Sequence, residues 1–209
     1  QRLAHAPIPM LSETWIEPAE GPGEICVPAG ETRTFRFEFD KIYSGYVGLT
    51  VSARDRCRAE AGVYETDGRV HERERIATKS DICYRGLRMQ SAGGYVITVC
   101  NEGASPVSVS RVGVYFSCYP VERRGKFECS DPELNSVWRV GLWTLQICRQ
   151  TLHLDSPLHQ ETLGCTGDYY VESLMEYFGF GDARLVRLDI VRTAEWLGMS
   201  GGHMFHTSY

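Results

Sequence analysis

The spacing of apolar residues changes once along this chain, near residue 120, and this change restricts the fold more than any other feature of the sequence. Between residues 24 and 119, apolar and polar residues alternate, which is typical of strands with one buried face. The run TFRFEFD, for example, places Phe35, Phe37 and Phe39 on one side of a strand. After YPVERRGKF, apolar residues recur every three or four positions, which is the period of a helix. Strands followed by helices predict two domains in series rather than βαβ units.

The first part of the chain is predicted to form an antiparallel β-sandwich domain over residues 1–119, of which residues 1–20 are a lead-in segment. Alternating runs such as GYVGLTVSA, YVITVCNEG and VSVSRVGVYFS are separated by turn segments such as EGPGE, ETDGR and SAGG. No convincing helical pattern occurs before residue 130. We therefore expect this part to consist of strands and turns.

The second part, residues 120–209, is predicted to be helical, and its first helix begins near Asp131. Ser130 is placed as the N-cap, because Glu133 follows at the spacing of a capping box and Pro132 is tolerated in a first turn. The predicted apolar stripe of this helix consists of Leu134, Val137, Trp138, Gly141, Leu142 and Leu145.

Two further helices are predicted, one over residues 168–178 and one that begins near Asp182. Helices linked as antiparallel hairpins are the start of a helical bundle or an α/α barrel. Three helices would leave apolar faces uncovered, so we expect the chain to be an N-terminal portion of a longer protein and inactive alone. The alternative is a three-helix domain packed on the sandwich. The predicted inward-facing residues are Tyr170, Val171, Leu174 and Met175 in the second helix, and Val186, Ile190, Ala194 and Leu197 in the third.

Composition excludes several classes of partner. The 209 residues carry a net charge of −5, and no run rich in lysine and arginine is present, which argues against binding nucleic acid. No apolar stretch approaches the roughly 20 residues that a spanning helix needs, so no membrane span is expected. The first residues, QRLAHAPIPML, lack the features of a secretory signal. A mature chain whose signal has been removed would look the same. We expect a soluble protein whose compartment stays open, with a periplasmic or secreted location slightly favoured.

The eight cysteines are scattered, with no CxxC pair and no zinc-site spacing. Buried free thiols are the favoured interpretation, although an even number also permits disulfides in an oxidising compartment. The sequence contains no Gly-rich phosphate-binding loop. We therefore expect neither a metal nor a cofactor.

Residues 155–168, DSPLHQETLGCTGD, place three carboxylates in a stretch that cannot be one helix. Pro157 disfavours helix for the residue before it, and Gly164 and Gly167 weaken it later, so the stretch is predicted to be a loop between two helices. Loops on a rigid scaffold are where binding and catalytic residues concentrate. Asp155 is either functional or a turn residue, and Asp168 is either functional or a cap of the following helix.

Glu161 is the strongest candidate in this loop for a chemical role. It lies among Leu158, Leu163 and Cys165, so a folded loop would partly remove its carboxyl group from water. Desolvation raises the pKa of a carboxyl group, which is what a general acid requires. The sequence therefore makes Glu161 a candidate proton donor.

Residues 119 to about 198, which begin YPVERRGKFECSDPELN and include LDSPLHQETLGCTGDYYVES, resemble the junction and barrel entry of bacterial α-L-rhamnosidases. That family consists of inverting enzymes with β-sandwich domains before an α/α six-hairpin barrel. Its acidic segment has the form Asp-x-Pro-x-Arg-Asp-Glu-Arg-x-Gly-Trp-x-Gly-Asp. The segment matches this chain without a gap, from Asp155 through Pro157, Glu161, Gly164 and Gly167 to Asp168.

Four positions depart from the family's segment. His159 and Gln160 stand in place of Arg and Asp, Thr162 replaces an Arg, and Cys165 replaces the Trp. Two cations and an aromatic side chain are therefore absent from positions that contact sugar in the family. These changes imply altered sugar contacts or a sub-group that acts on a different glycoside.

The resemblance implies an inverting hydrolase that cleaves terminal α-L-rhamnosides or related glycosides from plant or microbial glycans. Glu161 would be the general acid, Asp155 and Asp168 would bind sugar hydroxyls, and His159 and Gln160 would supply further contacts. The general base is expected beyond residue 209. Two alternatives remain: another α/α-barrel enzyme, such as a hydrolase or lyase for uronate-containing glycans, and a non-catalytic glycan-binding protein.

Overall fold

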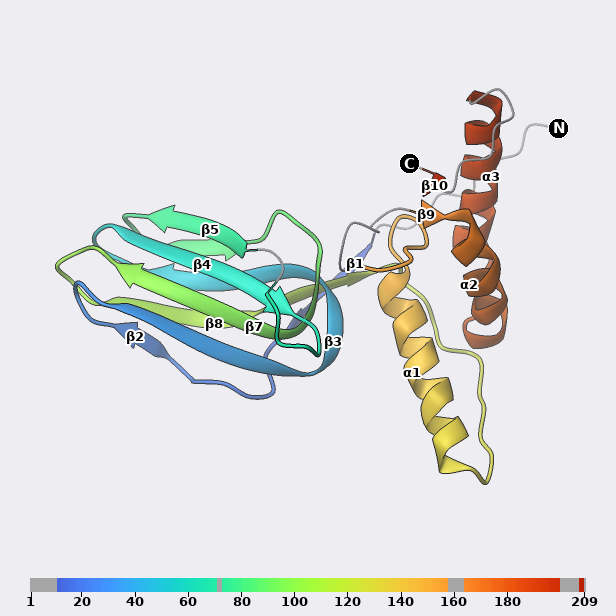
Figure 1. The fold of residues 1–209 in the computed structure, drawn as a ribbon, viewed down its shortest axis with the longest axis horizontal. Coiled ribbons are helices and arrows are strands. Elements are labelled where there is room, and N and C mark those ends of the chain that lie inside the picture. Colours follow the sequence, from blue (N-terminus) through green and yellow to red (C-terminus); the bar gives the residue numbers. More distant parts are fainter. Residues whose placement is uncertain (1–10, 71–72, 158–163, 200–206, 209) are drawn as a thin grey trace. The chain divides into compact units, whose positions relative to one another are not determined.

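The computed structural model describes residues 11–70, 73–157, 164–199 and 207–208 (Figure 1). The chain divides into two compact units. The β unit is Glu13–Ser117, and the helical unit comprises Gln1–Ser12 and Cys118–Tyr209. The predicted order of strands followed by helices is confirmed.

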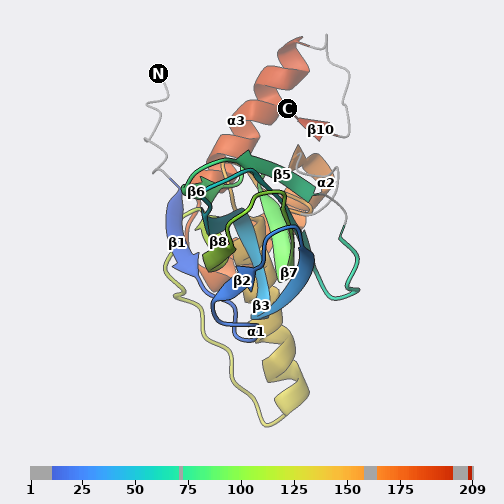
Figure 2. The same cartoon turned by 90° about the vertical axis from the view of Figure 1, so that its left-hand side faces the viewer.

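The strands of the β unit form one antiparallel sheet in the order β1-β8-β3-β7-β4-β5, with β2 beside β8 and β6 beside β3 (Figures 1 and 2). No helix occurs in the described residues before α1, as the sequence predicted. The strands are β1 (Ser12–Ile16), β2 (Ile25–Val27), β3 (Thr32–Ser52), β4 (Cys57–Tyr64), β5 (Arg73–Thr78), β6 (Ile82–Arg85), β7 (Gln90–Asn101) and β8 (Val107–Cys118).

The long strand β3 organises this sheet, because it exchanges neighbours along its length. Its first part pairs with β7 through a register shift between Glu38 and Tyr43, and its second part pairs with β8 and β6. The alternation predicted for TFRFEFD is confirmed, since Phe37 and Phe39 are buried and Phe35 is half-buried. Val47, Leu49 and Val51 continue the buried face into the second part of the strand.

A tryptophan from β1 packs over two glycines of the sheet. The ring of Trp15 lies 4.9 Å from the ring of Tyr115, in an edge-to-face arrangement. A Cβ atom at Gly48 would lie 2.6 Å from the Trp15 ring, and one at Gly113 would lie 2.4 Å from the carbonyl oxygen of Ile16. Both positions therefore require glycine, because any side chain would displace the ring or the strand.

In the helical unit, α1 (Pro132–Cys148) is capped by Asp131, whose carboxylate accepts hydrogen bonds from the backbone N–H groups of Glu133 and Leu134. The prediction of Ser130 as the cap is therefore wrong by one residue. Asp131 precedes the proline directly, and its negative charge also interacts favourably with the helix N-terminus. The remaining elements are β9 (Gly164–Cys165), α2 (Thr166–Gly179), α3 (Arg184–Met199) and β10 (Thr207–Ser208).

Part of the predicted helix packing is confirmed. Leu142 and Leu145 of α1 form a buried cluster with Phe180, against which Trp138 and Val121 pack. Of the residues in the predicted apolar stripes, Leu134, Val137 and Ile190 are exposed, whereas Val186 is buried.

Within the described residues, no helix combines the length and the apolar character that crossing a membrane requires.

The prediction for the inward face of α2 is wrong. Its predicted inward residues are exposed, with exposed fractions of 70% for Tyr170, 53% for Val171, 43% for Leu174 and 39% for Met175. The buried face consists of Tyr169, Glu172, Glu176 and Gly179 instead. The hydrophobic pattern misled because this helix buries carboxylates, one of which, Glu176, pairs with Arg149 and His153.

We expect Gly113→Ala to destabilise the protein by about 1–3 kcal/mol, because the added methyl group has no space against the backbone of Ile16. Urea unfolding at neutral pH measures the change. Gly23→Ala is the matched control, since a Cβ atom there meets nothing within 4 Å. A Gly113→Ala midpoint equal to that of Gly23→Ala would contradict the packing described.

Candidate active site

The structure places two of the five predicted site residues. Asp155 is exposed in the segment that follows α1, and Asp168 is half-buried in the first turn of α2. Glu161, His159 and Gln160 lie outside the described residues. The two described aspartates thus stand at the two ends of the loop that sequence analysis identified as the candidate site.

A tight return of the chain leads from α1 to Asp155. Arg149 and His153 form an antiparallel bridge, and the N–H group of Leu154 donates a hydrogen bond to the carbonyl oxygen of Cys148, at 2.9 Å. The Cys148 thiol is 3.8 Å from the carbonyl oxygen of Asp155. The backbone therefore passes from the completely buried His153 to the exposed Asp155 within two residues.

At the other end of the loop, Cys165 occupies the N-cap position of α2, so neither Thr166 nor Asp168 is the N-cap. β9 pairs with β10, with Cys165 opposite Thr207. The Cys165 thiol is partly desolvated and hydrogen-bonded to the Asp168 carboxylate, and both effects raise the pKa of the thiol. The cysteine that replaces the family's tryptophan therefore contacts the last aspartate of the segment.

Within the helical unit, five ionisable side chains form a buried charge cluster. Glu176 makes an ion pair with the Nε atom of Arg149, and its Oε1 atom lies 2.9 Å from Nε2 of His153. The Nδ1 atom of His153 contacts Oδ2 of Asp189 on α3. All members are at most 8% exposed: Arg149, His153, Glu172, Glu176 and Asp189.

Burial and pairing change the protonation of these groups. Burial alone would lower the pKa of His153, but hydrogen bonds to Asp189 and Glu176 outweigh it and raise that pKa to about 9. Burial raises the pKa of Asp189, against the opposing effect of His153. Burial also lowers the pKa of Arg149, although Glu176 opposes this change. At neutral pH, His153 is therefore a buried cation between two carboxylates.

Glu172 differs from the other carboxylates of the cluster. Burial raises its pKa to about 8; His153 opposes this shift, whereas Asp168, Asp189 and Glu176 add to it. Its Oε2 atom is buried and has no hydrogen-bond partner among the described residues. At neutral pH, Glu172 is therefore protonated for the most part.

Aromatic rings hold the cationic end of the cluster. The guanidinium group of Arg149 lies 4.7 Å from the ring centroid of Tyr119 and 5.0 Å from that of Phe180. The N–H group of Tyr119 also donates to the carbonyl oxygen of Arg149, at 2.8 Å. Cation–π contacts of this kind stabilise a desolvated guanidinium group. The segment between β8 and α1 (residues 119–131, called the junction below) therefore supports the buried arginine.

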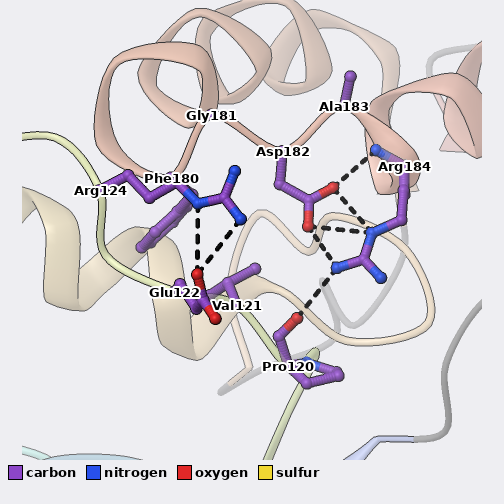
Figure 3. Close-up of a pocket in the computed structure, with 9 residues that line it drawn as sticks. All are labelled: Pro120, Val121, Glu122, Arg124, Phe180, Gly181, Asp182, Ala183 and Arg184. Carbon is purple, nitrogen blue, oxygen red and sulfur yellow. Dashed lines mark hydrogen bonds and ion pairs between the residues drawn. The ribbon is translucent and has the colours of Figure 1, made fainter.

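A second feature of the helical unit is a cavity of about 580 Å³ between the junction and the α2–α3 turn (Figure 3). Its charged residues pair with one another: Arg124 lies 3.2 Å from Glu122, and Arg184 makes an ion pair with Asp182. Burial would raise the pKa of Asp182, but hydrogen bonds from Arg184 lower it. Because these charges neutralise one another, we do not include the cavity in the candidate site. Its lining residues connect the junction to the turn between α2 and α3.

Sequence analysis missed the whole buried charge cluster. One signal was present, because Asp168, Glu172 and Glu176 recur at intervals of four and so share one face of α2. An acidic stripe is usually solvated, however, and the partners Arg149 and His153 lie more than twenty residues away in the sequence from Glu176. Among the described residues, no group of three or more His, Cys, Asp or Glu side chains is arranged so that it could hold a metal ion.

We expect the stability of the protein to fall as the pH rises from about 6.5 to 9. His153 has a folded-state pKa above its usual value of 6.5, so its contribution is complete below pH 6.5 and is lost as the pH passes about 9. His153→Gln should cost about 3–5 kcal/mol at pH 6, because it leaves buried carboxylates without their cation, and less at pH 9.

Urea unfolding of both proteins at pH 6, 7.5 and 9 provides the measurement. Arg139→Gln is the control, because Arg139 is an exposed cation of α1. If His153→Gln reduces the stability equally at all three pH values, His153 is not the charged group described.

Comparison with known proteins identifies a family whose model matches the helical part of this chain. Residues 122–195 match the model of the bacterial alpha-L-rhamnosidase 6 hairpin glycosidase domain. This range contains both described aspartates and the entire buried charge cluster. A search of curated proteins finds no match.

Several solved structures have a similar fold. A GH78 family rhamnosidase of Bacillus sp. GL1 matches 89% of this chain with a TM-score of 0.77 and 22% identity. A rhamnosidase from Klebsiella oxytoca, solved with rhamnose bound, matches 90% with a TM-score of 0.74 and 15% identity. An alpha-L-rhamnosidase from Dictyoglomus thermophilum matches 93% with a TM-score of 0.69 and 15% identity.

The matched part is 20%, 45% and 23% of those three chains, so this chain spans less than half the length of each. At these identities the structural comparisons establish the fold, and they confirm the predicted fold class of an antiparallel β region followed by the first helices of a six-hairpin barrel. The predicted resemblance to bacterial α-L-rhamnosidases is thereby confirmed, over residues 122–195 by sequence and over about nine tenths of the chain by fold.

Proposed function

We propose that the protein carrying this chain is a glycosidase that hydrolyses terminal α-L-rhamnosides, or closely related glycosides, with inversion at the anomeric carbon. The observation that carries the proposal is the family match over residues 122–195, which covers the acidic loop and the helices on both sides of it. Asp155 and Asp168, at the ends of that loop, are spaced as in the family's segment. A glycan is therefore the proposed substrate.

Each of the five candidate site residues has a role in this proposal. Glu161 donates a proton to the glycosidic oxygen, while a second carboxylate, about 6.5–9.5 Å away, activates water on the opposite face of the sugar. Asp155 and Asp168 accept hydrogen bonds from sugar hydroxyls, and His159 and Gln160 supply further contacts. Asp168 lies in the first turn of α2, at the end of the loop that carries Glu161 in the sequence.

The source of the substrate is also part of the proposal. Plant and microbial glycans carry terminal rhamnose, and a periplasmic or secreted enzyme would meet them directly. The changed side chains at His159, Gln160, Thr162 and Cys165 suggest that the sugar contacts differ from those of the family's common form. A panel of aryl glycosides that includes an α-L-rhamnoside and a uronide distinguishes the proposed substrate from a uronate.

We expect Glu161→Gln to lower kcat/KM by about 10²–10⁴-fold for a substrate with a poor leaving group, since glutamine cannot deliver a proton. The loss should be far smaller for a nitrophenyl glycoside, because nitrophenolate departs without protonation. Glu133→Gln, at the opposite end of α1 from the loop, is the matched control. Equal losses with both leaving groups would show that Glu161 is not the general acid.

We expect Asp155→Asn and Asp168→Asn to lower kcat/KM by similar factors for both leaving groups, because each removes a contact to the sugar rather than the proton donor.

Time-resolved NMR of the first sugar released should show the anomer of opposite configuration to the substrate. Release of the retained anomer would contradict the inverting mechanism, and turnover of the uronide alone would contradict the proposed sugar.

A further inference from the structure

The acidic face of α2 runs from the candidate site into the buried charge cluster. Asp168 lies in the first turn, Glu172 one turn further and Glu176 one turn beyond that. Side chains four residues apart lie one above the other on a helix, so Glu172 is beneath Asp168. Asp168 is half-buried, whereas Glu172 is only 8% exposed.

The charges around Glu172 can be counted element by element. α2 contributes Asp168 and Glu176, the segment at and after the end of α1 contributes Arg149 and His153, and α3 contributes Asp189, which Arg192 also influences. The two buried cations contact Glu176 and Asp189. Among the described residues, Glu172 makes no ion pair, and its buried Oε2 atom has no hydrogen-bond partner.

A third buried carboxylate without a cation is strongly unfavourable, because burial removes the solvation that stabilises its charge. The cluster is balanced when Arg149 and His153 are cationic, Glu176 and Asp189 are anionic, and Glu172 is neutral. Ionisation of Glu172 would place a surplus negative charge one helical turn from Asp168. That charge would repel the Asp168 carboxylate and displace it from the position in which it accepts hydrogen bonds from sugar hydroxyls.

We propose that Glu172 is a positioning residue of this site, which acts as a neutral carboxylic acid beneath Asp168 and keeps the Asp168 carboxylate available to the sugar. This inference rests on the proposed function, because it assigns Asp168 to sugar binding. Burial raises the pKa of Glu172 to about 8, so the neutral form prevails at pH 6.5 and is lost by pH 9. The protein therefore carries an alkaline limit to activity that is separate from the general acid.

The test removes the general acid first, because ionisation of Glu161 also lowers activity at high pH. In the Glu161→Gln protein, with a nitrophenyl α-L-rhamnoside, kcat/KM at pH 9 should be about tenfold below its value at pH 6.5, since a group with a pKa near 8 is about one-tenth protonated at pH 9. Adding Glu172→Gln should bring the ratio of the two rates close to one. Adding Glu172→Asp, which keeps an ionisable carboxyl group, should preserve the alkaline loss.

Three results would overturn the inference. The first is an alkaline loss that persists with Glu172→Gln, which would assign it to another group such as His153, whose pKa is about 9. The second is no alkaline loss in the Glu161→Gln protein. The third is a ¹³C resonance of the Glu172 carboxyl group that shows it ionised at pH 6.5, a measurement that needs no substitution at Glu172.

Controls separate failure of this inference from failure of the proposed function. Glu133→Gln in the Glu161→Gln protein should leave the alkaline loss unchanged, and circular dichroism at both pH values verifies that each variant is folded. Absence of turnover of every glycoside by the unsubstituted protein would overturn the proposed function and this inference with it. Turnover with an unchanged pH profile in Glu172→Gln would overturn the inference alone.

Discussion

The helical unit depends on the contact of Glu176 with Arg149 and His153. Through it, α2 is joined to the end of α1, and His153 extends the connection to Asp189 on α3. Breaking a buried ion pair leaves an uncompensated charge and costs about 3–5 kcal/mol, which is more than most single apolar contacts contribute. These ion pairs therefore link the three helices, beside the apolar cluster of Leu142, Leu145 and Phe180.

The same contact connects the scaffold to the candidate site. His153 is buried in the cluster, and the chain reaches the exposed Asp155 two residues later. Glu176 lies on the same face of α2 as Asp168, two turns away. Both described aspartates are thus tied by short, regular backbone to one buried network, which is how a site on a loop is given a defined geometry.

The sequence predicts the fold well where burial follows hydrophobicity. Phe37 and Phe39 alternate as a strand requires, and the change of period near residue 120 marks the start of the helical unit. It fails on α2, where Tyr170 is exposed and Glu172 is buried, because periodicity treats carboxylates as surface residues. The spacing of Asp155 and Asp168 along the sequence makes them candidates for the site. The cationic partners of Glu176 are distant from it in the sequence, and only the fold brings them into contact.

Buried charges and close packing both determine the register of α2. A Cβ atom at Gly179 would lie 2.3 Å from Cδ2 of Leu142, so a shift of α2 that brings a larger residue to this position would disturb the packing. Such a shift would also separate Glu176 from Arg149 and His153 and leave an unpaired buried charge. The buried ion pairs of Glu176 therefore also restrict the position of Asp168, which lies two turns earlier on the same face of α2.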